Sequence, residues 1–268
     1  MTSSDTSSAS QGASDFPLPR RALVTGAARR LGREIALTLA RAGWDVAIHF
    51  HKAAAEAAGL AEEIAGLGRL AAVLQADLSD PAQCARLVPD AGHELGPLGC
   101  LVNNASLFAW DTPADLDREM WNAHLETNLS APVFLTQAFA RQLGPEAGGA
   151  VINMLDQRVW NLTPYFTSYT ASKAALWAMT QSLALALAPR IRVNGIGPGP
   201  TLPSARQSTD DFERQWRKVP LERPTDPAEI GRAVRFILET PSMTGQMIAL
   251  DGGQHLGWRQ PIGPTPEE

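Results

Sequence analysis

The chain has 268 residues, which fits one large α/β domain, and 44% hydrophobic with 19% charged residues is ordinary for a globular protein. A net charge of −5 argues against general binding to nucleic acid or to acidic membranes, and no apolar run reaches the roughly 18 residues of a membrane-spanning helix. Cys84 and Cys100 form no CxxC pattern and are expected to be buried thiols in a reducing compartment, so we predict a cytoplasmic protein. The five histidines lack metal-ligand spacing, and no metal site is predicted.

Both ends of the chain are predicted to be tails. Residues 1–17 are rich in Ser, Thr, Ala and Gly and lack the hydrophobic region of a secretory signal, so a disordered tail is expected. Residues 261–268 are expected to be loose as well. One domain is predicted over residues 18–260.

Within that domain, predicted strands and helices alternate. The strands are expected at 21–26, 44–50, 70–78, 98–105, 148–155, 191–199 and 245–253, and the helices at 30–43, 53–68, 81–96, 117–143, 168–188 and 227–238. The strands are continuous apolar runs, which is typical of a parallel sheet covered on both faces. We therefore predict an α/β fold with a doubly wound parallel sheet of about seven strands.

One segment, residues 200–226, interrupts this alternation. It is rich in Pro, Ser, Arg and Asp. A loop of this length beside the carboxyl edge of a sheet is usually functional, and we predict a substrate lid.

The first strand–turn–helix unit reads VTGAARRLG, residues 24–32. Gly26 and Gly32 allow the backbone to turn tightly and to approach a pyrophosphate at a helix N-terminus. Arg30 stands where a related pattern places a middle glycine. An ordinary strand–helix turn remains the alternative interpretation.

The second strand ends in HFHK, residues 49–52. A site for NAD would place Asp or Glu here to bind the ribose 2′-hydroxyl, and neither is present. His51 and Lys52 suit a 2′-phosphate, with help from Arg30, unless they are simply solvated cations. We therefore predict NADP(H) as the cofactor.

Tyr169 and Lys173 lie four residues apart in a predicted helix and so face the same way. A nearby ammonium is expected to lower the pKa of the phenol, which would let Tyr169 exchange a proton with a substrate. The Y-x₃-K spacing alone is common in helices and is weak evidence.

Several motifs in order strengthen this interpretation: TGAARRLG (25–32), ADLSD (76–80), NNAS (103–106), ETNLSAP (126–132), YTASK (169–173), RVNGIGPG (192–199) and DGG (251–253). Over roughly residues 20–257 the chain resembles the short-chain dehydrogenase/reductase family. The resemblance implies a single-domain Rossmann-type fold, a homotetramer, and a catalytic relay of Asn128, Tyr169 and Lys173. It also implies a cofactor site made of Gly26, Arg29, Arg30, Leu31, Gly32, His51, Lys52, Asp77, Leu78, Asn104, Ala105, Pro198 and Gly199.

Asp156 stands thirteen residues before Tyr169, where members of that family usually have a catalytic serine. A serine hydroxyl donates a hydrogen bond to a carbonyl oxygen, whereas an ionised aspartate only accepts and is expected to raise the pKa of Tyr169. Such a site suits a substrate with N–H donors or a ring nitrogen that must gain a proton. A solvated strand end or a cap is the plainer interpretation of Asp156.

Together with RLG (30–32), HFHK (49–52) and NASLF (104–108), the aspartate resembles the pteridine reductases and the related dihydromonapterin reductases. The resemblance implies that Phe108 stacks on a flat pterin, and that Ser106 and Arg30 bind its polar edge or the cofactor phosphates. The substrate site would then comprise Arg30, Ser106, Phe108, Asp156 and Tyr169, although Phe108 could simply pack its loop. Trp216 and Trp258 are candidates to close the pocket, unless they simply pack against their neighbours.

Three functions remain open from the sequence. The first is NADPH-dependent reduction of a pterin C=N bond. The second is reduction of another carbonyl or imine substrate, such as a ketone or a 3-oxoacyl group, with Asp156 incidental. The third is a non-catalytic NADP-binding protein on the same fold. All three imply a small-molecule ligand rather than a nucleic acid or membrane partner.

Overall fold

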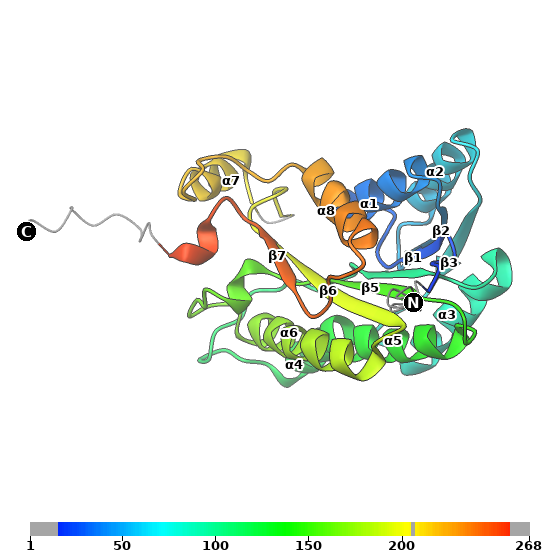
Figure 1. The fold of residues 1–268 in the computed structure, drawn as a ribbon. Coiled ribbons are helices and arrows are strands. Elements are labelled where there is room, and N and C mark those ends of the chain that lie inside the picture. The colour runs from blue at the N-terminus through cyan, green and yellow to red at the C-terminus, as the bar shows by residue number, and fades with distance from the viewer. Residues whose placement is uncertain (1–15, 205–206, 258–268) are drawn as a thin grey trace, which may run out of the picture.

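The framework of the protein is a sheet of seven parallel strands (Figure 1), seen in a computed structural model that describes residues 16–204 and 207–257. The strands are β1 (Arg21–Val24), β2 (Asp45–Phe50), β3 (Ala71–Gln75), β4 (Cys100–Asn103), β5 (Gly149–Met154), β6 (Ile191–Pro198) and β7 (Met247–Leu250), in the spatial order β3-β2-β1-β4-β5-β6-β7. The predicted parallel α/β sheet is confirmed. Most of the predicted N-terminal tail, the whole predicted C-terminal tail and Trp258 lie outside the described residues.

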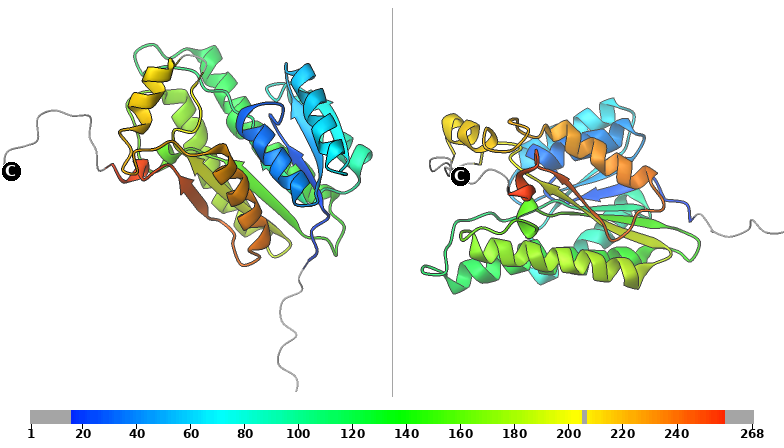
Figure 2. Two further views of the ribbon diagram at one scale, coloured as in Figure 1. Left: turned by 90° about the horizontal axis from the view of Figure 1, so that it is seen from above. Right: turned by 60° about the vertical axis from the view of Figure 1, so that its left-hand side comes forward.

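Helices cover both faces of the sheet (Figures 1 and 2). One face carries α1 (Arg30–Arg41), α2 (Ala54–Gly66) and α8 (Pro227–Glu239); the other carries α3 (Pro81–Leu95), α4 (Arg118–Leu125), α5 (Ala131–Gln142) and α6 (Thr167–Leu187). Among the described residues, no helix combines the length and apolar character needed to cross a membrane.

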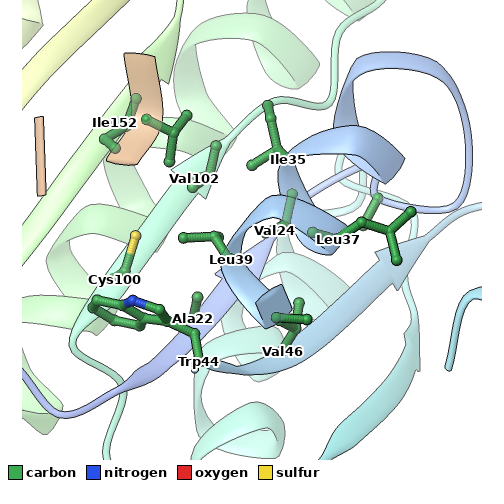
Figure 3. Packing of buried hydrophobic residues seen from close by; sticks show 14 of the residues in the cluster. Ala22, Val24, Ile35, Leu37, Leu39, Trp44, Val46, Cys100, Val102 and Ile152 are labelled. Atoms are coloured by element: carbon green, nitrogen blue, oxygen red, sulfur yellow. The ribbon is translucent and has the colours of Figure 1, made fainter. Parts of the chain in front are cut away.

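The strands are apolar throughout because successive side chains enter opposite cores. Val24 of β1 packs with α1 and α8 on one face, while its neighbour Leu23 packs with α3 and α5 on the other. Figure 3 shows the first core, where Ile35 and Leu39 of α1 lie close to the β1 and β4 side chains. A chain with polar residues at alternate strand positions would leave one of these faces unable to hold its helices.

The two cysteines are free and buried, as predicted. Cys100 belongs to the core beneath α1 and α8, and Cys84 to the core on the opposite face. Burial raises the pKa of Cys84 to about 11 and that of Cys100 to about 12, so neither thiol forms thiolate at neutral pH.

The helical stretch predicted over residues 117–143 is confirmed, but it is not one regular α-helix. The structure has α4, then a π-helical turn at Glu126–Ser130, then α5. Pro132 stands at the start of α5, where it has no N–H to donate to the carbonyl four residues earlier, so the regular ladder cannot continue through this point. The wider turn contains Asn128, which is buried.

The segment predicted as a lid, residues 200–226, contains a helix that the sequence pattern did not indicate. Helix α7 (Thr209–Trp216) begins with a capping box, in which Ser208 and Asp211 bond each other's backbone N–H. None of its residues is buried, so its short, strongly charged sequence lacked the apolar face that identifies a core helix.

Candidate active site

Every predicted site residue from the sheet lies at its carboxyl edge. The strand order reverses between β1 and β4, whose neighbours β2 and β5 lead outward in opposite directions. In doubly wound sheets the connections diverge at this point and leave a crevice beyond the strand ends. The ends of β1 to β6 and the segments that follow them carry the candidate cofactor and catalytic residues.

The turn after β1 has the geometry expected of a phosphate-binding turn. Gly26 has a φ of +62°, and Arg30 also has a positive φ, of 55°, which explains why a related pattern places glycine at that position. Helix α1 begins directly after this turn, and the side chain of its N-cap residue, Arg29, makes no capping hydrogen bond. The first N–H groups of α1 are therefore left for a ligand, and an anionic ligand suits them best.

A buried histidine that sequence reasoning missed fixes this turn. His49 of β2 accepts a hydrogen bond at Nδ1 from the Gly26 N–H (3.0 Å), so its Nε2, 3.0 Å from the Ala76 carbonyl oxygen, must be the donor. Burial lowers the pKa of His49 to about 4, which keeps the ring in this neutral form at physiological pH.

Gly32 is the least replaceable residue of the turn. A Cβ on Gly32 would lie 2.2 Å from the Gly26 carbonyl oxygen and 2.5 Å from Asn104 Nδ2. We expect Gly32→Ala to lower the free energy of unfolding by about 3 kcal/mol, because backbone atoms must move to admit the methyl group. Gly59→Ala in α2, where a Cβ meets nothing within 4 Å, is the control and should be neutral or stabilising in chemical denaturation. Equal stability of the two variants would contradict the packing argument.

Asp156 and Tyr169 are brought together as the thirteen-residue spacing predicts. The Tyr169 hydroxyl donates to Asp156 Oδ2 over 2.9 Å. Asp156 Oδ1 accepts from the Arg158 N–H (2.8 Å) and caps a 3-10 turn at Gln157–Val159. The plainer interpretation of Asp156 as a cap is therefore correct, and the same carboxylate reaches Tyr169 with its other oxygen.

Lys173 and Asn128, the other residues of the predicted relay, make hydrogen bonds close to Tyr169 but not to its hydroxyl. Lys173 Nζ donates to the Met154 carbonyl oxygen (2.7 Å) and lies 5.8 Å from the Tyr169 ring centroid. Asn128 Nδ2 donates to Ser172 Oγ (3.1 Å) and to the Leu107 carbonyl oxygen (2.9 Å). Asn128 thus fastens the loop after β4 to helix α6.

The pKa of Tyr169 departs from the sequence-based expectation. Its pKa is raised well above 10, first by burial and then by the charge of Asp156, while the charge of Arg158 lowers it. The predicted lowering by Lys173 is wrong, since burial and the charge of Asp156 raise the pKa of Tyr169 instead. Burial also lowers the pKa of Lys173, to about 8. The predicted effect of Asp156 on Tyr169 is confirmed in direction.

An aromatic wall borders this cluster. Phe108 stacks on Phe166, with ring centroids 4.5 Å apart and planes 12° apart, and meets the Tyr169 ring edge-on at 4.8 Å. Phe108 therefore packs its own loop, and it is still 39% exposed. Its packing role does not exclude stacking on a flat ligand. Phe166 and Arg158 were missed, because neither belongs to a motif and both reach the site through contacts across loops.

These residues line a cavity of about 630 Å³. Its walls include Arg30, Phe108, Trp110, Asp156, Gln157, Arg158, Phe166, Tyr169, the loop 198–202 and, from the lid segment, Ser204, Gln207, Phe212 and Gln215. Within the described part of the lid, Phe212 and Gln215 line this cavity, and Trp216 does not. The guanidinium of Arg217 instead covers the Trp216 ring at 5.1 Å.

Arg30 connects the phosphate turn to the lid. Its guanidinium donates to the carbonyl oxygens of Pro203 (2.7 Å) and Leu202 (3.2 Å). Arg30 lines both the large cavity and a second one, so it remains a candidate for either ligand.

The second cavity, of about 190 Å³, adjoins the first and shares Arg30, Asp156 and Tyr169 with it. It is lined by Arg30, Leu31, Asn104, Ser106, Met154, Leu155, Asp156, Tyr169, Lys173, Pro198, Gly199, Thr201 and Leu202. Ser106 faces this cavity, and its hydroxyl lies 3.2 Å from Asn128 Oδ1. Together with the uncapped start of α1, this cavity fits the reactive end of a dinucleotide.

The residues predicted to meet the far end of such a dinucleotide lie beside one another at the ends of β2 and β3. His51 and Lys52 are exposed just after β2. His51 Nε2 lies 3.6 Å from Asp77 Oδ2, and Asp77 accepts from the Ser79 N–H (2.9 Å). These bonds to Ser79, with the nearby His51, lower the pKa of Asp77. Leu78 is buried in the core beneath.

A buried polar network supports the loop that carries Phe108. Ser168, the residue before Tyr169, donates to Asp111 Oδ2 and lies 2.7 Å from His124 Nδ1. His124 Nε2 accepts from the Ala109 N–H (3.2 Å), so its Nδ1 must donate to Ser168. Sequence reasoning missed this network because its members are 13 to 57 residues apart in the chain.

Known proteins of similar sequence match this chain over most of its length. Residues 26–255 match a family model described as enoyl-(acyl carrier protein) reductase. A short-chain dehydrogenase/reductase, FrzI, of Cladobotryum sp is 35% identical over 88% of this chain and 96% of its own. The 3-oxoacyl-[acyl-carrier-protein] reductase FabG of Staphylococcus aureus is 30% identical, over 89% of this chain and 99% of its own.

The solved structures include a nearer relative. FolM alternative dihydrofolate reductase 1 from Brucella canis, crystallised with NADP, is 49% identical, has a TM-score of 0.88, and is matched over 92% of this chain and 98% of that chain. A blue fluorescent protein from a metagenomic library, in complex with NADPH, is 31% identical with a TM-score of 0.81, over 87% and 97% of the two chains.

Proposed function

The chain belongs to the short-chain dehydrogenase/reductase family of oxidoreductases, and from this premise we propose that it is an NADPH-dependent reductase of a pterin C=N bond. The observation that carries the proposal is the hydrogen bond from the Tyr169 hydroxyl to Asp156 Oδ2, in a cavity bordered by Phe108. The 49% identity to a dihydrofolate reductase of the FolM type, whose substrate contains a pterin ring, supports it. The third interpretation, a non-catalytic protein, loses its basis with the family assignment.

The cofactor would be held by the residues that the sequence singled out: Gly26, Arg29, Arg30, Leu31 and Gly32 at the phosphates, His51 and Lys52 at the 2′-phosphate, Asp77, Leu78, Asn104 and Ala105 at the adenosine, and Pro198 and Gly199 beside the nicotinamide. NADPH supplies the hydride when bound. The FolM enzyme was crystallised with NADP and the blue fluorescent protein with NADPH, and both relatives support this choice of cofactor.

The proton comes from Tyr169. Its raised pKa keeps the phenol protonated at neutral pH, so it can act as the general acid toward a pterin ring nitrogen. Lys173, buried four residues further along α6, is the cation that stabilises the phenolate left behind. Asp156 accepts hydrogen bonds only, which suits the N–H groups of a pterin and opposes a bare carbonyl oxygen.

A direct test is the rate of NADPH oxidation with dihydropterins, simple ketones, quinones and 3-oxoacyl thioesters as substrates. We expect dihydropterins to have the highest kcat/KM. Good turnover of ketones with none of any pterin would overturn the proposal.

The second candidate is reduction of a 3-oxoacyl or other carbonyl substrate. The FabG relatives and the description of the family model favour it. The residue at position 156 discriminates the two, because a carboxylate does not donate the hydrogen bond that stabilises a developing oxyanion.

The preference for NADPH should depend on Lys52. We expect Lys52→Glu to lower the ratio of kcat/KM for NADPH to that for NADH by about tenfold or more, because a charge-assisted bond to the 2′-phosphate is lost and a repulsion is added. NADH, which lacks this phosphate, is the internal control. A ratio that does not change would place Lys52 among solvated surface cations.

We also propose a cytoplasmic homotetramer. Phe134 of α5 and Leu185 of α6 are 60% and 84% exposed, and they support association through these two helices.

A further inference from the structure

Arg158 occupies a position that neither a motif nor the family resemblance assigns to the reaction. Its Nη1 lies 3.2 Å from Asp156 Oδ2, the same oxygen that accepts from the Tyr169 hydroxyl. The side chains of Arg158 and Asp156 are only 16% and 13% exposed, so solvent screens this pair far less than a surface ion pair.

The guanidinium is held from a second direction by the aromatic wall. It lies 5.0 Å from the Phe166 ring centroid and 5.6 Å from that of Phe108. The two rings and Asp156 together restrict the orientation of Arg158, and Arg158 lines the large cavity beside them. These contacts hold the Arg158 side chain in one place, unlike a mobile side chain on the surface.

Four titratable or charged groups face Tyr169 from the elements packed around it. Asp156 and Arg158 follow β5, Lys173 lies on α6, and His124 of α4 lies with its ring centroid 6.1 Å from that of Tyr169. Burial lowers the pKa of His124, which leaves it uncharged at neutral pH. Within this set, Arg158 is the cation in direct contact with the carboxylate.

We propose that Arg158 is a positioning residue of the reaction, which holds the Asp156 carboxylate against the Tyr169 hydroxyl and supplies the positive charge that a carboxylate at this position requires. This inference rests on the proposed function only in taking Tyr169 as the group that gives the proton. An aspartate in place of the usual serine makes the phenol a weaker acid, and Arg158 opposes that effect. Substitution of the serine would thus be tolerated because the arginine two residues later compensates.

The test is the steady-state kcat and KM of NADPH oxidation at neutral pH in three variants. Arg158→Met keeps the apolar stem and removes the charge, Arg158→Lys keeps a charge, and Arg235→Met on the exposed face of α8 is the control. In Arg158→Met we expect kcat to fall about tenfold or more with little change in the KM for NADPH, because the carboxylate is no longer held against the phenol. Arg158→Lys should recover much of the lost kcat, and Arg235→Met should leave kcat unchanged.

A double-mutant cycle with Asp156→Ser separates positioning from direct substrate binding. If Arg158 acts through Asp156, Arg158→Met costs much less in the Asp156→Ser background than in the parent. Additive losses, or a parent-like kcat in Arg158→Met, would overturn the inference. Thermal unfolding of each variant identifies any that fail to fold, in which case Arg158→Lys carries the comparison.

Both constants are measured with whichever substrate the assay shows to be reduced. A loss of kcat in Arg158→Met with a ketone, and no turnover of pterins by the parent, would remove the pterin proposal and leave the role of Arg158 standing. A parent-like kcat in Arg158→Met with a pterin would do the reverse.

Discussion

Tyr169→Phe is expected to lower kcat by roughly 10²- to 10⁴-fold, because in the proposed reaction the phenol is the proton donor and phenylalanine has no proton to give. The fold should not change, since the hydroxyl bonds Asp156 at the cavity wall and the ring keeps its packing against Phe108. The KM for NADPH should therefore stay close to the parent value, and the loss should be confined to kcat.

The matched control is Tyr165, the only other tyrosine in the sequence. The Tyr165 ring stacks on Trp110 at 4.9 Å and is 48% exposed, so Tyr165→Phe retains the stacking and removes only an exposed hydroxyl. Steady-state NADPH oxidation and thermal unfolding of both variants check the prediction. Full activity in Tyr169→Phe, or equal losses in the two variants, would show that another group supplies the proton.

Asp156→Ser is expected to change which substrates are reduced. For dihydropterins we expect kcat/KM to fall by about 100-fold, because the substrate N–H groups lose their acceptor inside a largely buried site. For simple ketones kcat/KM should rise, since a serine hydroxyl donates to a carbonyl oxygen and the pKa of Tyr169 is no longer raised by a carboxylate.

The effect must be separated from loss of the cap that Asp156 provides to the turn at Gln157–Val159. A serine can accept the same bond from the Arg158 N–H, so the turn should persist. Asp115→Ser is a suitable control, because Asp115 also accepts a backbone N–H, that of Thr112, but lies exposed outside the site. Unchanged turnover of pterins in Asp156→Ser would favour the carbonyl-reductase candidate and make the aspartate incidental.

The pairing of Asp156 with Tyr169 could be predicted from the resemblance to the short-chain dehydrogenase/reductase family, whose members usually have a catalytic serine thirteen residues before the tyrosine. The pKa shifts of the site could not be predicted from the sequence. The expectation that Lys173 lowers the pKa of Tyr169 took only these two residues into account. The burial of both side chains and the position of Arg158 also act on the two pKa values. Burial depends on every element packed around the site, so a local motif does not contain it.

The sequence by itself determined the parallel sheet, because the periodicity of apolar residues is a local property of the chain, and its short motifs singled out the turn after β1 and the candidate residues Asn128, Asp156, Tyr169 and Lys173. Only the tertiary structure decided the contacts of His49 and Phe166, the attachment of Arg30 to the segment 200–226, and the place of Arg158 between Asp156 and the aromatic wall. The contacts of His49, Phe166 and Arg30, and that of Arg158 with Phe108, join segments distant in sequence, and such contacts exist only once the strand ends have been brought to one edge of the sheet. The π-helical turn before Pro132 is local, but the helical pattern on both sides of it concealed the loss of a single N–H donor.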